Sequence, residues 1–190
     1  MTYSIVASDP RTGEHGVAVQ SHWFSVGGLV TWAEPGIGAV ATQANVDAGY
    51  GPRALELLRG GTRATQTLRE LVARDDLRDF RQVAVVDAGG EVAAHTGDAC
   101  MQHAGHVIGA DHACQANIMA SPGVWPAMSE AFTAAEGNLA RRLLAALDAA
   151  EAAGGDIRGR QSAAMLVVGA EGEPWDRLVD LRVEDHPEPL

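Results

Sequence analysis

Short apolar runs alternate with stretches of helical periodicity along this chain of 190 residues. The apolar runs are rich in Val, Ile and small residues and are bounded by turn residues. This pattern is typical of strands that are covered on both faces. The predicted strands are 2–7, 16–20, 28–32, 37–42, 82–86, 91–95, 106–108, 113–119, 162–168 and 178–183.

Between these strands, apolar residues recur three and four positions apart, which predicts amphipathic helices in two consecutive pairs. Proline at a first helical position and glycine just past the last one mark their ends. The predicted helices run from Pro52 to a stop at 60–61, from an N-cap at Thr62 through 72, from Pro126 to 135, and from 139 to a stop at 154–155.

The elements therefore follow as four strands, two helices, four strands, two helices and two strands, without a linker or an internal repeat. Helices that come in consecutive pairs favour layered sheets over a doubly wound parallel sheet. We expect an α+β fold in which two sheets pack face to face and each is covered by one helix pair. Residues 1–190 then form a single domain, a four-layer αββα sandwich.

The charge balance limits the partners of this protein. The formal net charge is -11, from 25 acidic and 14 basic residues, so nucleic acid and anionic membranes are unfavourable partners. Every basic residue is Arg, which excludes Schiff-base chemistry on Lys. The apolar runs are shorter than the ~20 residues of a membrane span, and the start of the chain lacks the pattern of a signal peptide. We expect a cytoplasmic homodimer or higher homo-oligomer that acts on a small molecule or peptide without a cofactor.

The chain resembles a known family over essentially its whole length, and five segments carry the resemblance. They are TYSIVA at 2–7, QSHWFSVG at 20–27, GAVATQA at 38–44, GGDIRGRQS at 154–162 and DLRVEDHP at 180–187. The sequence is similar to the family called domain of unknown function 1028, whose members have a fold like that of the N-terminal-nucleophile (Ntn) hydrolases. The order of elements resembles the same fold, which proteasome β subunits share.

The resemblance makes Thr2 the candidate nucleophile. A small residue after Met1 suits removal of the methionine, which leaves Thr2 at the N-terminus. Its hydroxyl then acts as the nucleophile, and its α-amino group, with an ordinary pKa of about 7.7–8.0, acts as the base. The proteasome family also uses a Lys near the nucleophile, so Arg160 or His22 would supply the positive charge here. We expect hydrolysis of a linear amide or a short peptide.

Further polar residues lie next to predicted strand ends. Ser21 and His22 follow the second strand and suit either substrate binding or a structural turn. Gln43 ends the fourth strand, where backbone N–H groups can stabilise an oxyanion; Gln43 and Asn45 equally suit bonds to the local backbone. Asn117 lies two positions from Gln115, so both amides share a strand face and either contact substrate or brace the core. We also expect Asn117 to help the backbone near Gln43 to hold the oxyanion.

The segment before strand 162–168 carries Asp156, Arg160 and Gln161, which we assign to substrate binding. The planar guanidinium of Arg160 suits recognition of a carboxylate. An ion pair of Arg160 with Asp156 or Asp185 is the alternative.

Two other functions stay open. A metal-dependent hydrolase would use the region of Cys100, His106 and Cys114, with His103 and His112 nearby, although the spacing matches no standard zinc motif. A non-catalytic protein that binds a small ligand would keep the fold without the chemistry. Our assignment includes no metal ligand.

Overall fold

The structure is a computed structural model that describes residues 2–190, and it contains two antiparallel sheets. The six-stranded sheet has the order β10-β9-β2-β1-β8-β7, and the four-stranded sheet has the order β3-β4-β5-β6. The strands of the first sheet are β1 (Thr2–Asp9), β2 (Glu14–Ser21), β7 (Gly105–Ile108), β8 (His112–Asn117), β9 (Ser162–Val168) and β10 (Val179–Val183). Those of the second are β3 (Thr31–Glu34), β4 (Gly38–Ala44), β5 (Arg81–Asp87) and β6 (Val92–Thr96).

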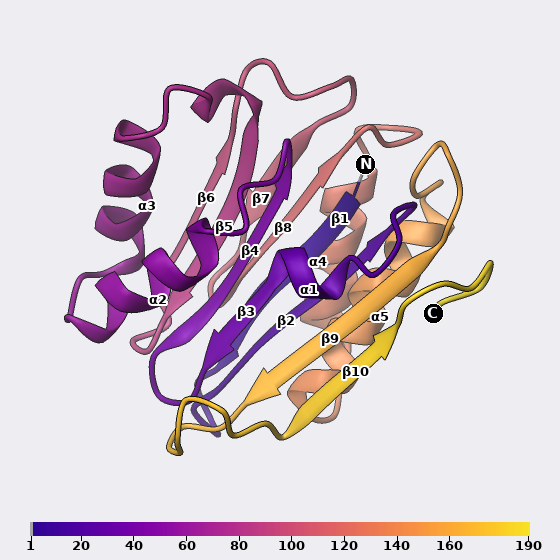
Figure 1. The fold of residues 1–190 in the computed structure, drawn as a ribbon. Helices are drawn as coiled ribbons and strands as arrows, with labels where there is room; N and C mark the ends of the chain where they lie inside the picture. The colour runs from indigo at the N-terminus through magenta and orange to yellow at the C-terminus, as the bar shows by residue number, and fades with distance from the viewer. Residues whose placement is uncertain (1) are drawn as a thin grey trace.

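Two pairs of helices, α2 with α3 and α4 with α5, lie on the outer faces of the two sheets (Figure 1). The helices are α1 (Gly27–Val30), α2 (Tyr50–Arg59), α3 (Ala64–Ala73), α4 (Val124–Ala134) and α5 (Leu139–Ala152), and η1 (Arg78–Phe80) is a 3-10 turn. The pair α2 and α3 shares a buried cluster with the four-stranded sheet, and the pair α4 and α5 shares one with the six-stranded sheet. A third cluster joins the two sheets. The predicted mixture of two sheets and paired helices is therefore confirmed.

Alternation along β1 explains why the strands lack polar faces. Ile5 packs toward the helices of the six-stranded sheet, whereas Val6 packs toward the second sheet. Close packing also requires the absence of a side chain at Gly16, where a Cβ would lie 2.7 Å from Leu143 Cδ1. Both faces of this central strand are thus buried, and apolar burial is the main source of stability in a folded domain.

Several predicted boundaries are wrong. Helix α2 begins at Tyr50 and α4 at Val124, each two residues before the proline that was predicted to open it. Residues 28–32 do not form one strand, because Gly27–Val30 is a short helix and β3 begins only at Thr31. The Thr31 hydroxyl donates to Gly27 O at 2.8 Å and holds this turn. Thr62 is not an N-cap, because α3 begins at Ala64 and Asp87 Oδ2 accepts the Ala64 N–H instead. The turn at 27–31 is thus held by a local bond, whereas the start of α3 is held by a carboxylate 23 residues away.

Across the described part of the chain, every helix is too short or too polar to cross a bilayer.

Candidate functional site

The ends of several strands meet around the first residue of β1. Thr2 pairs with Ser21, the last residue of β2, and with Asn117, the last residue of β8. Gln43 lies one residue before the end of β4 in the facing sheet. Antiparallel pairing therefore brings together four side chains that the sequence spreads over 116 positions, from Thr2 to Asn117.

The main chain and the side chain of Thr2 are both held. Thr2 Oγ1 lies 3.0 Å from Ser21 Oγ. Thr2 O accepts hydrogen bonds from Gln43 Nε2 at 3.2 Å and from Asn117 Nδ2 at 3.4 Å. The residue is buried, with 6% of its surface exposed. The contact with Ser21 therefore restricts the rotation of the Thr2 hydroxyl.

Thr2 opens into a pocket of about 200 Å³ between the two sheets and α1. The polar side chains that line it are those of Thr2, Ser21, Gln43 and Asn45. The remaining lining residues are Trp23, Val26, Leu29, Val30, Ala44 and Val46. None of these described lining residues carries a formal charge. The pocket is thus an uncharged cavity with a hydroxyl pair on its wall.

Unusual backbone conformations cluster at this end of the sheets. Ser25, Ala44 and Ile118 have positive φ angles of 55°, 69° and 56°. Ser25 and Ile118 follow the last residues of β2 and β8, and Ala44 is itself the last residue of β4. Non-glycine residues in this region cost of order 1–3 kcal/mol each and concentrate at functional sites. Their clustering independently marks this end of the sheets as a candidate functional site.

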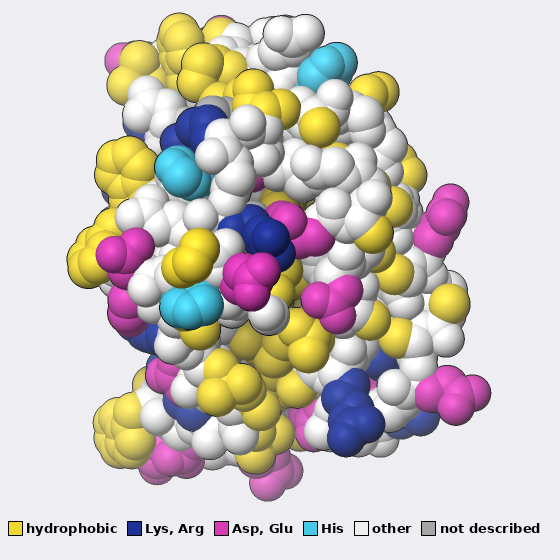
Figure 2. Space-filling model, turned by 90° about the vertical axis from the view of Figure 1, so that its right-hand side faces the viewer, with side chains coloured by type: hydrophobic (Ala, Val, Ile, Leu, Met, Phe, Trp, Pro, Cys, Tyr) yellow, Lys and Arg dark blue, Asp and Glu magenta, His cyan; other side chains and the backbone are white. Residues whose placement is uncertain are grey.

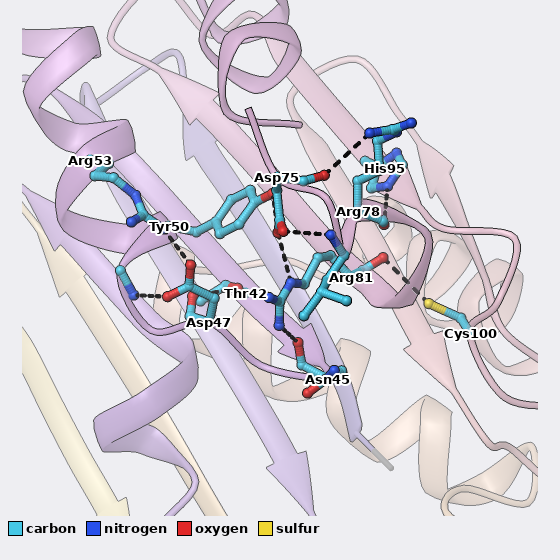
Figure 3. Close-up of polar contacts among 12 residues, drawn as sticks. Thr42, Asn45, Asp47, Tyr50, Arg53, Asp75, Arg78, Arg81, His95 and Cys100 are labelled. Atoms are coloured by element: carbon cyan, nitrogen blue, oxygen red, sulfur yellow. Dashed lines mark hydrogen bonds and ion pairs between the residues drawn. The ribbon is translucent and has the colours of Figure 1, made fainter. Parts of the chain in front are cut away.

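A polar cluster outside the pocket fixes the loop that forms one of its walls (Figure 3). Arg81 donates through Nε to Asp75 Oδ2 at 2.8 Å and through a terminal nitrogen to Asn45 O. The Asn45 N–H donates to Phe80 O at 3.1 Å, so the loop is bonded on both sides. Tyr50 also donates to Asp75 Oδ2, at 2.9 Å. Asp75 and Arg81 therefore anchor the segment that carries Ala44 and Val46.

The carboxyl group of Asp75 gives this anchor a defined dependence on pH. Burial raises its pKa, but hydrogen bonds from Arg81, the Leu77 N–H and Tyr50 outweigh burial and leave the pKa below the ordinary value. A lowered pKa contributes stability above the unfolded pKa of about 3.9, and this contribution is lost as the pH falls through the folded pKa. The stabilisation is thus complete at neutral pH and disappears in acid.

Asp75→Asn is expected to lower the free energy of unfolding by about 2 kcal/mol at neutral pH, because charged hydrogen bonds are lost. The difference from the wild type should shrink between about pH 4 and lower pH, where Asp75 is protonated in both states. Urea denaturation across this range measures both effects. Asp76→Asn, at an exposed neighbour, is the matched control. An equal loss of stability at every pH would contradict the role of the Asp75 carboxylate.

Buried amides connect the site to both sheets. Gln82 Oε1 accepts from Gln43 Nε2 at 2.7 Å and from Asn117 Nδ2 at 3.0 Å. Gln82 Nε2 donates to Ala116 O at 2.9 Å and Gly105 O at 3.0 Å. Gln115 Nε2 donates across the sheets to Ala41 O at 3.1 Å. Of the two readings of Asn117 and Gln115, these bonds favour bracing of the core.

The loop before β9 lies beside the site but outside the lining of the pocket. Asp156 is buried, and its Oδ2 accepts the His22 N–H at 3.2 Å. Gln161 donates its backbone N–H to Ser21 O at 3.2 Å and its side chain to Asp185 Oδ1 at 3.1 Å. These contacts hold the end of β2 in place.

Arg160 pairs with neither of the acidic residues considered from the sequence. Its Nε lies 3.5 Å from Glu151 Oε2. The other oxygen of Glu151 accepts from the buried Tyr3 hydroxyl. Burial and this hydrogen bond to Glu151 raise the pKa of Tyr3, so it stays a proton donor at neutral pH. Arg160 thus belongs to a polar contact on the helix side of β1.

The described cysteine and histidine side chains do not come together to form one metal-binding group. Within residues 2–190, no group of three His, Cys, Asp or Glu side chains is arranged to hold a metal ion. Cys100 donates to Arg81 O at 3.3 Å, and His106 Nδ1 lies 2.8 Å from Thr96 Oγ1. Burial raises the pKa of Cys100 and of Cys114, which disfavours the thiolate that binds zinc. The alternative of a metal-dependent hydrolase therefore has no supporting geometry.

Sequence reasoning missed the apolar side of the pocket. Leu29 and Val30 were placed in a strand, although they belong to α1 and line the cavity. Trp23 is 57% exposed, and Phe24 beside it is 61% exposed. Two adjacent aromatic residues between polar Ser21 and a Gly-Gly pair are the signal that would have pointed to a binding loop, since exposed aromatic residues mark recognition surfaces.

Comparison with solved structures finds proteins that align along nearly the whole chain, including the following two. A crystal structure of a DUF1028 protein from Silicibacter pomeroyi aligns with a TM-score of 0.89 and 37% sequence identity, over 98% of this chain and 82% of that chain. Anbu (ancestral beta-subunit) from Yersinia bercovieri aligns with a TM-score of 0.42 and 13% identity, over 97% of this chain and 88% of that chain. No curated protein matches the sequence.

The sequence profile of a family covers residues 2–190 and is described as "Family of unknown function (DUF1028)". It extends over every segment on which the resemblance was based. The chain therefore belongs to the DUF1028 family.

Proposed function

We propose that this protein is an amidohydrolase of the Ntn type, built as a four-layer αββα sandwich, with Thr2 as its nucleophile. The observation that carries the proposal is the position of Thr2: it begins a central strand, lines a pocket and has its hydroxyl 3.0 Å from Ser21 Oγ. The clustered strained residues support the same location. Removal of Met1, which the mechanism requires, concerns a residue outside the described part of the chain.

In the proposed reaction the Thr2 hydroxyl attacks the carbonyl carbon of an amide, and its proton passes to the free α-amino group of Thr2. The C–N bond then breaks, and the leaving nitrogen takes that proton. Water hydrolyses the resulting ester, which releases the acid and restores the hydroxyl. Ser21 orients the Thr2 hydroxyl throughout, because the two oxygens are within hydrogen-bond distance.

We assign the oxyanion site to backbone N–H groups beside Gln43, at the strained turn of Ala44. The Asn45 N–H does not contribute, because it donates to Phe80 O. The side-chain amides of Gln43 and Asn117 both donate to Thr2 O, so they position the nucleophile. An oxyanion donor of this kind typically contributes ~100–1,000-fold to the rate.

The pocket favours a small, neutral acyl group. Its volume of about 200 Å³ is below the ~300–1,000 Å³ of sites for drug-sized ligands. Its apolar wall includes Val26, Leu29 and Val30, and Arg160 lies outside the lining. A carboxylate in this cavity would be desolvated without a cationic partner, at a cost of several kcal/mol. We therefore place a neutral apolar group there rather than the anionic group expected from the sequence.

Leu29→Ala is expected to move the preference from small toward bulkier neutral acyl groups by about 10-fold, because it removes part of the pocket wall. The measurement is kcat/KM on a series of acyl amides that differ only in acyl size. Leu77→Ala truncates an exposed leucine outside the pocket and serves as the control. Unchanged relative kcat/KM values in the Leu29 variant would place the acyl group elsewhere.

A non-catalytic small-ligand binder is the second candidate. It is favoured by the absence of an acid, a histidine or a cysteine among the described lining residues of the pocket. Without the amino group of Thr2, these residues supply no base.

The experiment that separates the two candidates combines intact mass with an assay. The hydrolase proposal expects a mature chain that lacks Met1 and hydrolyses members of a panel of neutral amides. Full retention of Met1 together with ligand binding in the pocket would instead support the binder.

A further inference from the structure

The six-stranded sheet ends in a strand whose outer edge is open. β10 pairs with β9 on one side and is the last strand in the sheet order. As in any edge strand, alternate N–H and C=O groups point away from the partner and can pair with another strand. Native proteins protect such edges, so an open one with apolar side chains requires an explanation.

Apolar side chains surround this edge on the side of α5 (Figure 2). Leu181 is 62% exposed, Leu144 on α5 is 41% exposed, and Val183 is 37% exposed. These residues line a groove of about 150 Å³, together with Pro189 and Leu190 near the end of the sequence. Groups of exposed apolar residues of this kind mark association surfaces.

The sequence of β10 is complementary to itself. If two copies pair antiparallel about Leu181, Asp180 of each lies opposite Arg182 of the other, and Val179 lies opposite Val183. Within one chain, Arg182 Nε already lies 3.2 Å from Asp180 Oδ1, so both charges are on the same face of the strand. Opposite charges across a strand pair are stabilising, and like charges are destabilising.

The apolar face of β10 is also suited to pairing with a second copy. Val179 packs against the cluster under α4 and α5, and Leu181 and Val183 line the groove beside α5. A two-fold axis at Leu181 would therefore bring the α5 helices of both copies together over the apolar side chains. The charged pairs would form on the opposite face.

We propose that a second copy of this chain binds the free edge of β10, pairing antiparallel about Leu181. The result is a symmetric dimer in which one continuous sheet runs through both copies. Such an interface is isologous, because the same strand contributes on both sides. The proposal is independent of the reaction at Thr2.

Charge reversal tests this register. Arg182→Asp places two acidic side chains opposite each other at each pair and is expected to raise the dimer dissociation constant at least about 10-fold. The double variant Asp180→Arg with Arg182→Asp restores opposite charges and should recover the affinity of the wild type. Sedimentation velocity over a concentration series measures the dissociation constant for each protein.

The control is Arg69→Asp, an exposed residue on α3 in the outer layer of the other sheet, which should leave the dissociation constant unchanged. Thermal unfolding checks that each variant is folded. A wild-type mass of 19.8 kDa at all concentrations up to about 100 μM would overturn the proposal. A dimer that is insensitive to both the single and the double variant would also overturn it.

Discussion

Thr2→Ala is expected to lower kcat/KM for amide hydrolysis by at least about 1,000-fold, since it removes the nucleophile and leaves only binding and oxyanion stabilisation. Alanine, like threonine, is small enough to allow removal of Met1, so the variant isolates the contribution of the hydroxyl. Steady-state kinetics on the best neutral amide, with intact mass to verify the N-terminus, measure the effect.

Two further forms of the protein distinguish the contribution of the Thr2 hydroxyl from that of its α-amino group. Thr2→Ser keeps both groups and should retain part of the activity, whereas a form that keeps Met1 should lose nearly all of it. Thr133→Ala removes an exposed hydroxyl on α4 and serves as the control. If the form with Met1 is as active as the processed one, the α-amino group is not the base and the Ntn mechanism fails. The assignment of the fold would be unaffected.

Gln82→Met is expected to lower the free energy of unfolding by about 3 kcal/mol. The change leaves the amides of Gln43 and Asn117 without the acceptor that they share, at about 1–3 kcal/mol for each unsatisfied buried group. For a chain of this size the loss corresponds to a decrease in Tm of roughly 6–12 °C. Chemical denaturation and calorimetry measure the two quantities.

The Gln82 variant also tests the link between the amide network and the candidate site. Gln43 and Asn117 both hold Thr2 O, so their displacement should lower the activity at temperatures where the protein is still folded. Gln66→Met makes the same substitution at an exposed position of α3 and should change stability by less than about 0.5 kcal/mol. A Gln82 variant as stable as the wild type would show that the network does not depend on this residue.

Much of the element order follows from local patterns in the sequence. The strands around Val6, Val17, Val40 and Val85 are continuous apolar runs, and such runs are buried whichever sheet they join. Glycines 60 and 61 end α2, and the turn at residues 87–90 joins β5 to β6. The prediction of 28–32 as one strand was wrong for a physical reason. Gly27 packs so closely on Ala164 that a Cβ would lie 2.5 Å from that methyl group, and this contact is tertiary.

Some features of the candidate site also follow from the sequence, whereas others depend on the tertiary structure. The N-terminal position of Thr2 and the strand-end positions of Ser21, Gln43 and Asn117 are properties of the sequence. The register that sets Thr2 opposite both Ser21 and Asn117 is not, because it depends on which strands become neighbours.

Only the tertiary structure shows that Arg160 contacts Glu151 and lies outside the lining of the pocket. The same holds for Gln82, whose side chain accepts hydrogen bonds from residues of both sheets. Sequence patterns report burial and local conformation, since these depend on residues a few positions apart. The partner of a buried amide or a guanidinium is whichever group the packing of two sheets brings within about 3 Å, and that distance exists only in the folded chain.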